Sequence, residues 1–376
     1  MALTVNTNVS AMATRHQLKG VMSDASTSLE RLSSGSRINT AKDDAAGLQI
    51  ANRLHVQTRG IDVAIRNAND GMSIVETAES SLDETTNIML RMRDLSIQSA
   101  NGNNSDADRQ ALQHEVSSLN DELNRIAETT SFGGEKLING TYGTKSFHIG
   151  PNTDAIMVSL TDMRTDSERM GGDSYLAQNG KDSNWTVTDA TNQLNIQFQD
   201  VANQTVNVQI EAKSGDNIEE LATYINGQTD EISASVNENG QLQLFVPNHD
   251  VKSDLTFSGS LASELALSKQ GQLTVDSLNI STVGGAQQAI AVLDASLTYV
   301  DSQRGQLGAI HNRFESGISN LGNMSINVND SKGQLRDADF AKEATSLTKS
   351  KILQQASNAI IAQANQLPSA ATNLLH

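Results

Sequence analysis

Long stripes of aliphatic residues run through both ends of the chain and are absent from its middle. In the N-terminal third, apolar residues recur at steps of three, four or seven positions: Leu54, Ile61, Ile65, Ala68, Met72, Val75, Leu82 and Met89. In the C-terminal third the same steps connect Ile290, Leu293, Leu297, Val300, Leu307, Ile310, Phe314, Ile318 and Leu321. Such spacing places the apolar side chains on one side of a helix, which then needs a partner helix. We therefore expect the two ends of the chain to pack on each other.

The N-terminal part is expected to form two helices before residue 101. A loose apolar stripe, interrupted by polar residues, predicts a marginal helix over about 3–32. Gly35 supplies a turn, and Thr40 with Asp43 matches a capping box at the start of the next helix. That helix should run over about 43–100, roughly 85 Å at 1.5 Å per residue.

Three more helices complete the two ends of the chain. Ser105 with Asp108 predicts a second capping box, followed by a third helix. After residue 285 the helical period returns and holds to about residue 321. The segment 322–333 begins and ends with glycine, which predicts a hinge. A last helix is expected over about 338–367.

The middle of the chain alternates apolar with polar residues, which is typical of strands. Asn239-Gly240 is a strong hairpin turn, and one short helix is expected over about 216–225. A separate hairpin is expected at 147–149 and 156–160, and the other strands at 185–188, 194–198, 206–210, 232–236 and 242–246. The fold class is therefore mainly α: a long antiparallel helical coiled-coil rod formed by both chain ends, with a small α+β outer domain from the middle.

The composition excludes several classes of protein. Aromatic residues make up only 3% of the 376 residues, which suits narrow helix–helix seams better than a large globular core. A net charge of −17 disfavours nucleic acid as a partner. The absence of cysteine excludes disulfides and thiolate metal sites. We expect no membrane span and no Sec signal peptide, so a secreted role would need another export route.

The sequence offers no complete catalytic or metal-binding motif. His114-Glu115 begins a zinc-protease motif, but Ser118 stands where the second histidine is required. Asp43-Asp44 is expected to complement the dipole of a first helical turn rather than to do acid–base chemistry. We therefore expect no enzyme, no cofactor and no metal.

Several long blocks resemble the signatures of bacterial flagellins. Residues 26–54 (STSLERLSSGSRINTAKDDAAGLQIANRL) and 97–102 (IQSANG) resemble the N-terminal signature, and residues 302–322 and 335–367 the C-terminal one. Residues 132–140 (FGGEKLING) are similar to the family's Phe-Asn-Gly loop, with Gly133 where asparagine is usual. The central stretch looks like a small insert motif found in flagellins and hook-associated proteins.

The resemblance implies a structural subunit that assembles with copies of itself into the extracellular helical filament of the bacterial flagellum. Residues 1–42 and 335–376 would pair as a coiled coil lining the inner tube of the filament. Residues 43–165 and 280–334 would form a helical rod with a β-hairpin. Residues 166–279, here called the insert, would form a surface-exposed β-rich domain.

The resemblance also implies partners. The unfolded chain would leave the cell through the flagellar type III export apparatus, with a chaperone on the C-terminal helix, and would meet the flagellar cap and hook-associated proteins. Flagellins that bind the innate immune receptor TLR5 use an arginine, a leucine and a glutamate that match Arg91, Leu95 and Glu115 here. The expected assembly seam consists of Ile61, Ile65, Met72, Val75, Leu82, Leu297, Leu307, Ile310, Phe314 and Ile318.

Other functions stay open at this point. A hook–filament junction protein shares the terminal helices, although the unbroken match at both ends favours flagellin. An enzyme displayed on a filament would need a catalytic motif that the insert lacks. A coiled-coil surface adhesin with a carbohydrate-binding insert would rest on the single tryptophan, Trp185.

Overall fold

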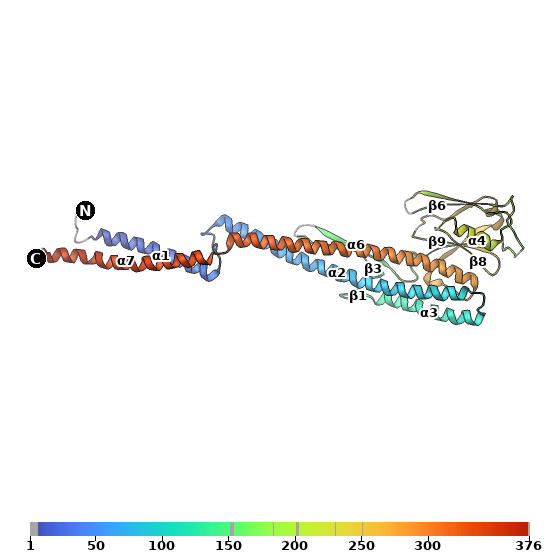
Figure 1. Cartoon of the computed structure of the whole chain (residues 1–376), viewed down its shortest axis with the longest axis horizontal. Coiled ribbons are helices and arrows are strands. Elements are labelled where there is room, and N and C mark those ends of the chain that lie inside the picture. Colours follow the sequence, from blue (N-terminus) through green and yellow to red (C-terminus); the bar gives the residue numbers. More distant parts are fainter. Residues whose placement is uncertain are drawn as a thin grey trace. The chain divides into compact units, whose positions relative to one another are not determined.

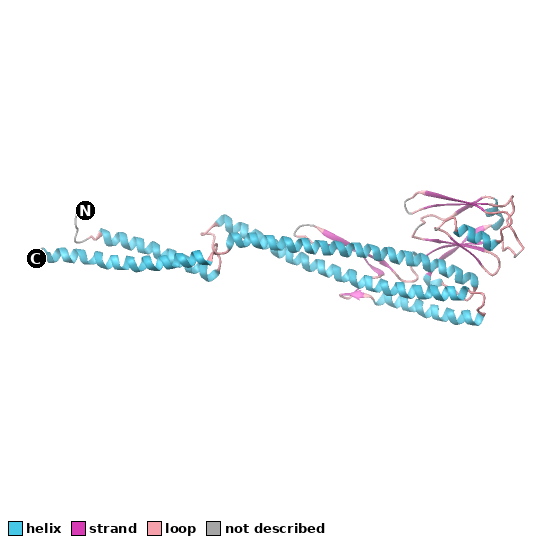
Figure 2. Cartoon of the chain, in the orientation of Figure 1, coloured by secondary structure: helices cyan, strands magenta, loops and turns pink. Residues whose placement is uncertain are grey.

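The computed structural model describes residues 7–150, 154–182, 184–200, 203–229, 231–249 and 251–374, without the side chains of 367–374. It divides into two compact units. The first comprises the described parts of Met1–Arg66, Ile149–Asp154 and Ile318–His376. The second comprises Asn67–His148 and Ala155–Gly317. The first unit is helical, and the strands gather in the second (Figure 2).

In the first unit, helices α1 (Val9–Ser34) and α7 (Phe340–Leu374) lie side by side, as expected from the two ends of the chain (Figure 1). Their direction is antiparallel, because the Asn8 side chain donates to the Ala364 carbonyl at 2.7 Å, and the Ala338 N–H donates to Gly35 at 3.0 Å. Gly35 ends α1 in the left-handed region at φ 66°, which favours glycine. The predicted start of this helix at residue 3 lies outside the described residues.

The predicted capping box at Thr40 is wrong. Helix α2 (Ala45–Ala100) begins after Asp44, whose carboxylate accepts the Gly47 N–H at 2.8 Å. Asp43 instead accepts the backbone N–H of Thr40 at 2.9 Å and so holds the turn before the helix. The two adjacent aspartates thus have different roles. Only Asp44 caps α2, because it lies three residues before an N–H of the first turn that has no partner within the helix.

Two predicted helix boundaries in the C-terminal part are also wrong. Helix α6 (Val283–Arg336) runs unbroken through the segment 322–333 that was expected to be a hinge. The break lies at residues 337–339 instead. Glycine costs a helix only about 1 kcal/mol, and packing of nearby apolar residues offsets that cost. Helix α7 continues past residue 367 and through Pro368, since a proline near a helix end removes only one hydrogen bond.

The N-terminal end of α2 packs on the C-terminal end of α6 within the first unit. The buried residues Ile61, Ala64, Leu321 and Val328 form one cluster. Leu54, Ile65 and Met324 pack around it, partly exposed. Leu321 and Val328 are seven residues apart, so the predicted seam of α6 extends into this unit and beyond its expected end.

In the second unit, α2, α3 (Asp106–Thr129) and α6 form the rod helices. The predicted capping box of Ser105 and Asp108 is confirmed at the start of α3. On α6, Leu293, Val300, Leu307 and Phe314 are buried at intervals of seven residues. Ion pairs along the same helices join Arg93 to Asp294 at 2.5 Å and Arg304 to Asp83 at 2.8 Å.

Gly71 of α2 packs against the side chain of Phe314 on α6. A Cβ atom on Gly71 would lie 2.6 Å from Cζ of Phe314 and 3.1 Å from Cγ of Phe147. The two phenylalanine rings meet edge to face, with their centroids 6.0 Å apart. Gly71 is therefore part of the packing rather than a local weakness of the helix.

Short strands lie beside the rod helices. Strands β1 (Ser131–Phe132) and β2 (Glu135–Lys136) form a small ladder. Strands β3 (Asn139–His148) and β4 (Ala155–Asp162) form the predicted antiparallel hairpin.

The insert contains two small antiparallel sheets. One has the order β10-β6-β7 and the other β11-β5-β9-β8. Its elements are β5 (Gly171–Ala177), β6 (Gln193–Gln199), β7 (Thr205–Glu211), α4 (Ile218–Asn226), β8 (Ser233–Val236), β9 (Leu242–Pro247), β10 (Thr256–Ser258), α5 (Ser260–Leu265) and β11 (Leu267–Thr274), with short 3-10 turns at Glu168–Met170 and Val275–Ser277. The turn at Asn239-Gly240 joins β8 to β9 as predicted, with Gly240 at φ 67°.

The predicted strand at residues 185–188 is wrong. Val187 is buried there and exchanges hydrogen bonds with Gly215 and Asp216, but this segment joins no sheet ladder. The apolar residues of this segment alternate because Val187 is buried, and not because the segment pairs with a strand.

Candidate assembly and receptor surfaces

The seam between α1 and α7 is built from small and polar residues. On α7 the buried positions fall seven apart, at Glu343, Ser350, Ser357 and Ala364. They face Ala11, Val21 and Ser28, the buried positions of α1. Small side chains let two helices approach closely, but they bury little apolar area, so this pair is held weakly by its own seam.

The large apolar residues of α1 and α7 point to solvent instead. The apolar stripe expected on α1 consists of Val5, Val9, Met12, Val21, Met22, Ala25, Leu29 and Leu32, and that expected on α7 of Phe340, Ala344, Leu347, Leu353, Ala356, Ile360 and Ala364. Val5 lies outside the described residues. Val21 and Ala364 are buried, whereas the large residues Val9, Met12, Met22, Leu29, Phe340, Leu353 and Ile360, together with Ile352, are 41% to 64% exposed. A monomeric protein rarely exposes so many large apolar side chains without a partner. The predicted apolar sides are therefore only partly correct: Val21 and Ala364 lie in the seam, but the large residues do not, because small residues complete it.

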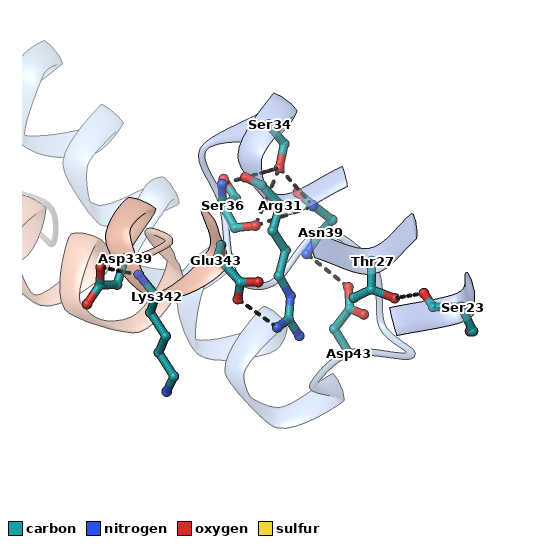
Figure 3. A network of polar contacts seen from close by, with 10 residues as sticks. All are labelled: Ser23, Thr27, Arg31, Ser34, Ser36, Asn39, Asp43, Asp339, Lys342 and Glu343. Carbon is teal, nitrogen blue, oxygen red and sulfur yellow. Dashed lines mark hydrogen bonds and ion pairs between the residues drawn. The ribbon is translucent and has the colours of Figure 1, made fainter. Parts of the chain in front are cut away.

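Polar contacts join the C-terminal end of α1 to the N-terminal end of α7, here called the terminal pair of helices, and Figure 3 shows these contacts. Arg31 of α1 forms an ion pair with Glu343 of α7 at 3.0 Å, and the Glu343 side chain is only 11% exposed. Asn39 donates its side-chain amide to Ser34 at 2.8 Å and its backbone N–H to Asp43 at 3.1 Å. Hydrogen bonds from the backbone N–H groups of residues 40 and 39 are the main cause that lowers the pKa of Asp43. Polar side chains thus hold the turn between α1 and α2, together with Ile38, which is only 1% exposed.

The residues of the expected assembly seam lie inside the chain. Ile61, Val75, Leu82, Leu307 and Phe314 are buried. The other five, Ile65, Met72, Leu297, Ile310 and Ile318, are half-buried. The seam therefore holds α2 and α6 within each unit, and its half-buried members keep part of their surface exposed.

The three residues matched to receptor binding differ in accessibility. Arg91 of α2 and Glu115 of α3 form an exposed ion pair at 2.7 Å. Leu95, one turn along α2, is only 1% exposed. The structure thus brings Arg91 and Glu115 together on a surface and places Leu95 in the core beneath them.

The described part of the chain contains no group of three or more metal-ligating side chains. Ser118 donates its hydroxyl to the backbone carbonyl of His114 at 3.0 Å, as an ordinary helix residue does. None of the helices in the described residues combines the length and apolar character that a membrane crossing needs.

Comparison with known families matches both ends of the chain and part of the insert. The bacterial flagellin N-terminal helical region matches residues 5–143, and the C-terminal helical region matches residues 290–375. The chain belongs to the bacterial flagellin family. The flagellin hook IN motif also matches, at residues 193–246, so the insert carries its own family signature.

Similar flagellins span the full length of this one. It is 58% identical to flagellin D of Vibrio anguillarum and 57% identical to flagellin D of Vibrio cholerae, in each case over 100% of both chains. A solved structure of hook-associated protein-3 from Legionella pneumophila is 16% identical, covers 76% of this chain and 98% of that one, and has a TM-score of 0.46. The 57–58% identity to flagellins over the full length of both chains supports the assignment of this chain as a subunit of the filament. It is a structural subunit of the extracellular flagellar filament and not an enzyme.

Proposed function

We propose that the outward apolar sides of α1 and α7 are the surfaces through which this flagellin contacts neighbouring copies. The observation that carries the proposal is the exposure of large apolar residues such as Met12 and Ile352 beside a seam of small ones. Covering these side chains with neighbouring subunits removes apolar area from water, which stabilises the polymer and the terminal helices together. In this arrangement residues 1–42 and 335–376 form the inner tube, residues 43–165 and 280–334 the rod, and residues 166–279 the outer domain.

Seeded polymerisation of purified monomer tests this proposal. Full-length monomer should form long filaments by electron microscopy, and a chain lacking residues 338–376 should not. If the shortened chain formed normal filaments, α7 would not be needed for subunit contact and the proposal would fail.

The same surface of α7 suits an export chaperone and the proteins at the filament ends. One exposed face of α7 presents Ala344, Thr345, Thr348, Lys349, Ile352 and Leu353. A chaperone that covers this face would keep the chain from polymerising before type III export. Pull-down of a chaperone by monomer should then be lost in Ile352→Asp and retained in Gln209→Glu, which changes the charge of the insert.

We also propose that Arg91 and Glu115 contribute to recognition by TLR5, with Leu95 packed beneath them. The ion pair is exposed, so removing it should cost no more than about 1 kcal/mol of stability and leave the fold intact. Receptor signalling by monomeric Arg91→Ala should fall well below that of the wild type. Arg125→Ala is the matched control, because Arg125 forms an exposed ion pair with Glu122 on α3. Equal potency of the two variants would refute the receptor assignment.

A further inference from the structure

The first turn of α6 is capped by a carboxylate from the insert. Thr282 accepts the Gly285 N–H at 3.1 Å, as a local cap does. Glu238, in the turn between β8 and β9 and 46 residues earlier, accepts the Gly284 N–H at 3.1 Å. The first N–H groups of a helix lack partners within it, and its positive end favours an anion. Glu238 therefore completes a helix that belongs to the rod.

The hairpin turn approaches α6 closely because position 284 is glycine. A Cβ atom there would lie 2.6 Å from the Cα atom of Asn237, closer than real side chains come to backbone. One turn further along α6, the Gln288 side chain donates to the hydroxyl of Ser174 on β5 at 3.0 Å. Ser174 is only 6% exposed. The four-stranded sheet is thus attached to the first two turns of α6 at two points.

The insert also contacts α6 beyond these two points. The ring centroid of His249 lies 6.1 Å from that of Tyr299 on α6, and Phe245 of β9 is only 1% exposed. A cleft of about 1090 Å³, lined by Phe245, by Ala222 of α4 and by Ile290 and Ala291 of α6, leaves part of the facing surfaces unpacked. Partial burial raises the pKa of Glu238, but its hydrogen bonds outweigh burial and hold the pKa below the ordinary value. The carboxylate is accordingly ionised at neutral pH.

We propose that Glu238 is a latch that fixes the orientation of the insert on α6. When Glu238 accepts the Gly284 N–H, the latch is closed, and the insert and α6 move together as one rigid body. With the latch open, the insert is held by its two chain connections, by Ser174 and by the packing of His249 on Tyr299, and the turn at residues 237–240 can move away from α6. Glu238 is therefore a positioning residue that determines how the outer domain is presented, and it is not needed for the fold of either part.

Distance measurement between two spin labels tests the latch directly. The chain has no cysteine, so Gln209→Cys on β7 and Ser302→Cys on α6 give unique, exposed labelling sites. The doubly labelled parent should give one narrow distance distribution. Adding Glu238→Ala should broaden it, and adding the control Glu211→Ala at the exposed end of β7 should leave it narrow. An unchanged, narrow distribution in Glu238→Ala would overturn the proposal.

A second variant separates the latch from folding. Gly284→Ala keeps the carboxylate and improves helix propensity, but its methyl group displaces Asn237. It should broaden the distances as Glu238→Ala does. In both variants, amide exchange of residues 237–240 and 283–285 should rise by about tenfold or more, while that of β6 and β9 stays unchanged. Faster exchange throughout the insert would show that Glu238 serves folding, and it would refute a role confined to positioning.

Discussion

Gly71→Ala is expected to destabilise the rod helices, although alanine is the better helix former. In an open helical position the substitution would gain about 1 kcal/mol. Here the new Cβ would lie 2.6 Å from Cζ of Phe314, 3.0 Å from its Cε1 atom and 3.1 Å from Cγ of Phe147. Phe314 is fully buried, so its ring cannot move away freely. Overpacking of this kind costs about 1–3 kcal/mol, so the net loss should reach up to about 2 kcal/mol.

Equilibrium denaturation of the monomer, followed by circular dichroism, measures this loss. Gly305→Ala is the control, because no atom lies within 4 Å of its Cβ position on α6 and the variant should gain about 0.5–1 kcal/mol. In a Phe314→Leu background the two contacts to the Phe314 ring are removed and only that to Phe147 remains, so Gly71→Ala should cost less than it does in the wild type. If Gly71→Ala stabilised the wild type as much as Gly305→Ala does, the proposed packing of α2 on α6 would be wrong.

Two further predictions concern the rod and the insert. Leu307→Ala removes a buried member of the heptad seam and should cost about 2–5 kcal/mol by the same denaturation assay, whereas exposed Gln306→Ala should change stability by less than about 0.5 kcal/mol. Hydrogen bonds from Trp185 and Lys181 lower the pKa of Glu264 below its ordinary value of 4.5. The stabilisation from Glu264 is therefore present above that value and is lost as the pH falls through the lowered pKa. Emission from Trp185, the single tryptophan, should shift over this acidic range in the wild type and show no such step in Glu264→Gln.

The rod helices follow from the sequence because their buried positions are large and regularly spaced. Leu293, Val300, Leu307 and Phe314 repeat every seven residues, and nothing else in the chain offers them a better partner. The caps and turns at Ser105 and Asn239-Gly240 were equally predictable, since each depends on two neighbouring residues.

The terminal pair shows where hydrophobic pattern misleads. The pattern assigned the large residues of α7 to its packed side, but Ser350 and Ser357 lie there instead. According to the proposed function, the large apolar residues of a terminal helix contact other copies of the subunit. The same apolar pattern then predicts the wrong packed side for the helix within one chain. A sequence of one chain does not distinguish contacts within it from contacts between copies.

The insert shows a different limit. Strand β5 begins with two glycines, and its apolar and polar residues alternate poorly. It is a strand because its backbone pairs with β11 on one side and with β9 on the other. The capping of α6 by Glu238 joins positions 46 residues apart. No local sequence motif predicts such a pair, because Glu238 and the first turn of α6 come together only when the chain folds.

The critical concentration for seeded polymerisation tests most directly whether the exposed apolar sides of α1 and α7 drive assembly. Met12→Ser combined with Ile352→Ser should leave the circular dichroism of the monomer unchanged, because both side chains are exposed in the single chain. It should raise the critical concentration by at least about tenfold, since less apolar area is covered in the polymer. Gln209→Ser in the insert should polymerise as the wild type does. Filaments formed by the double variant at the wild-type critical concentration would contradict the account.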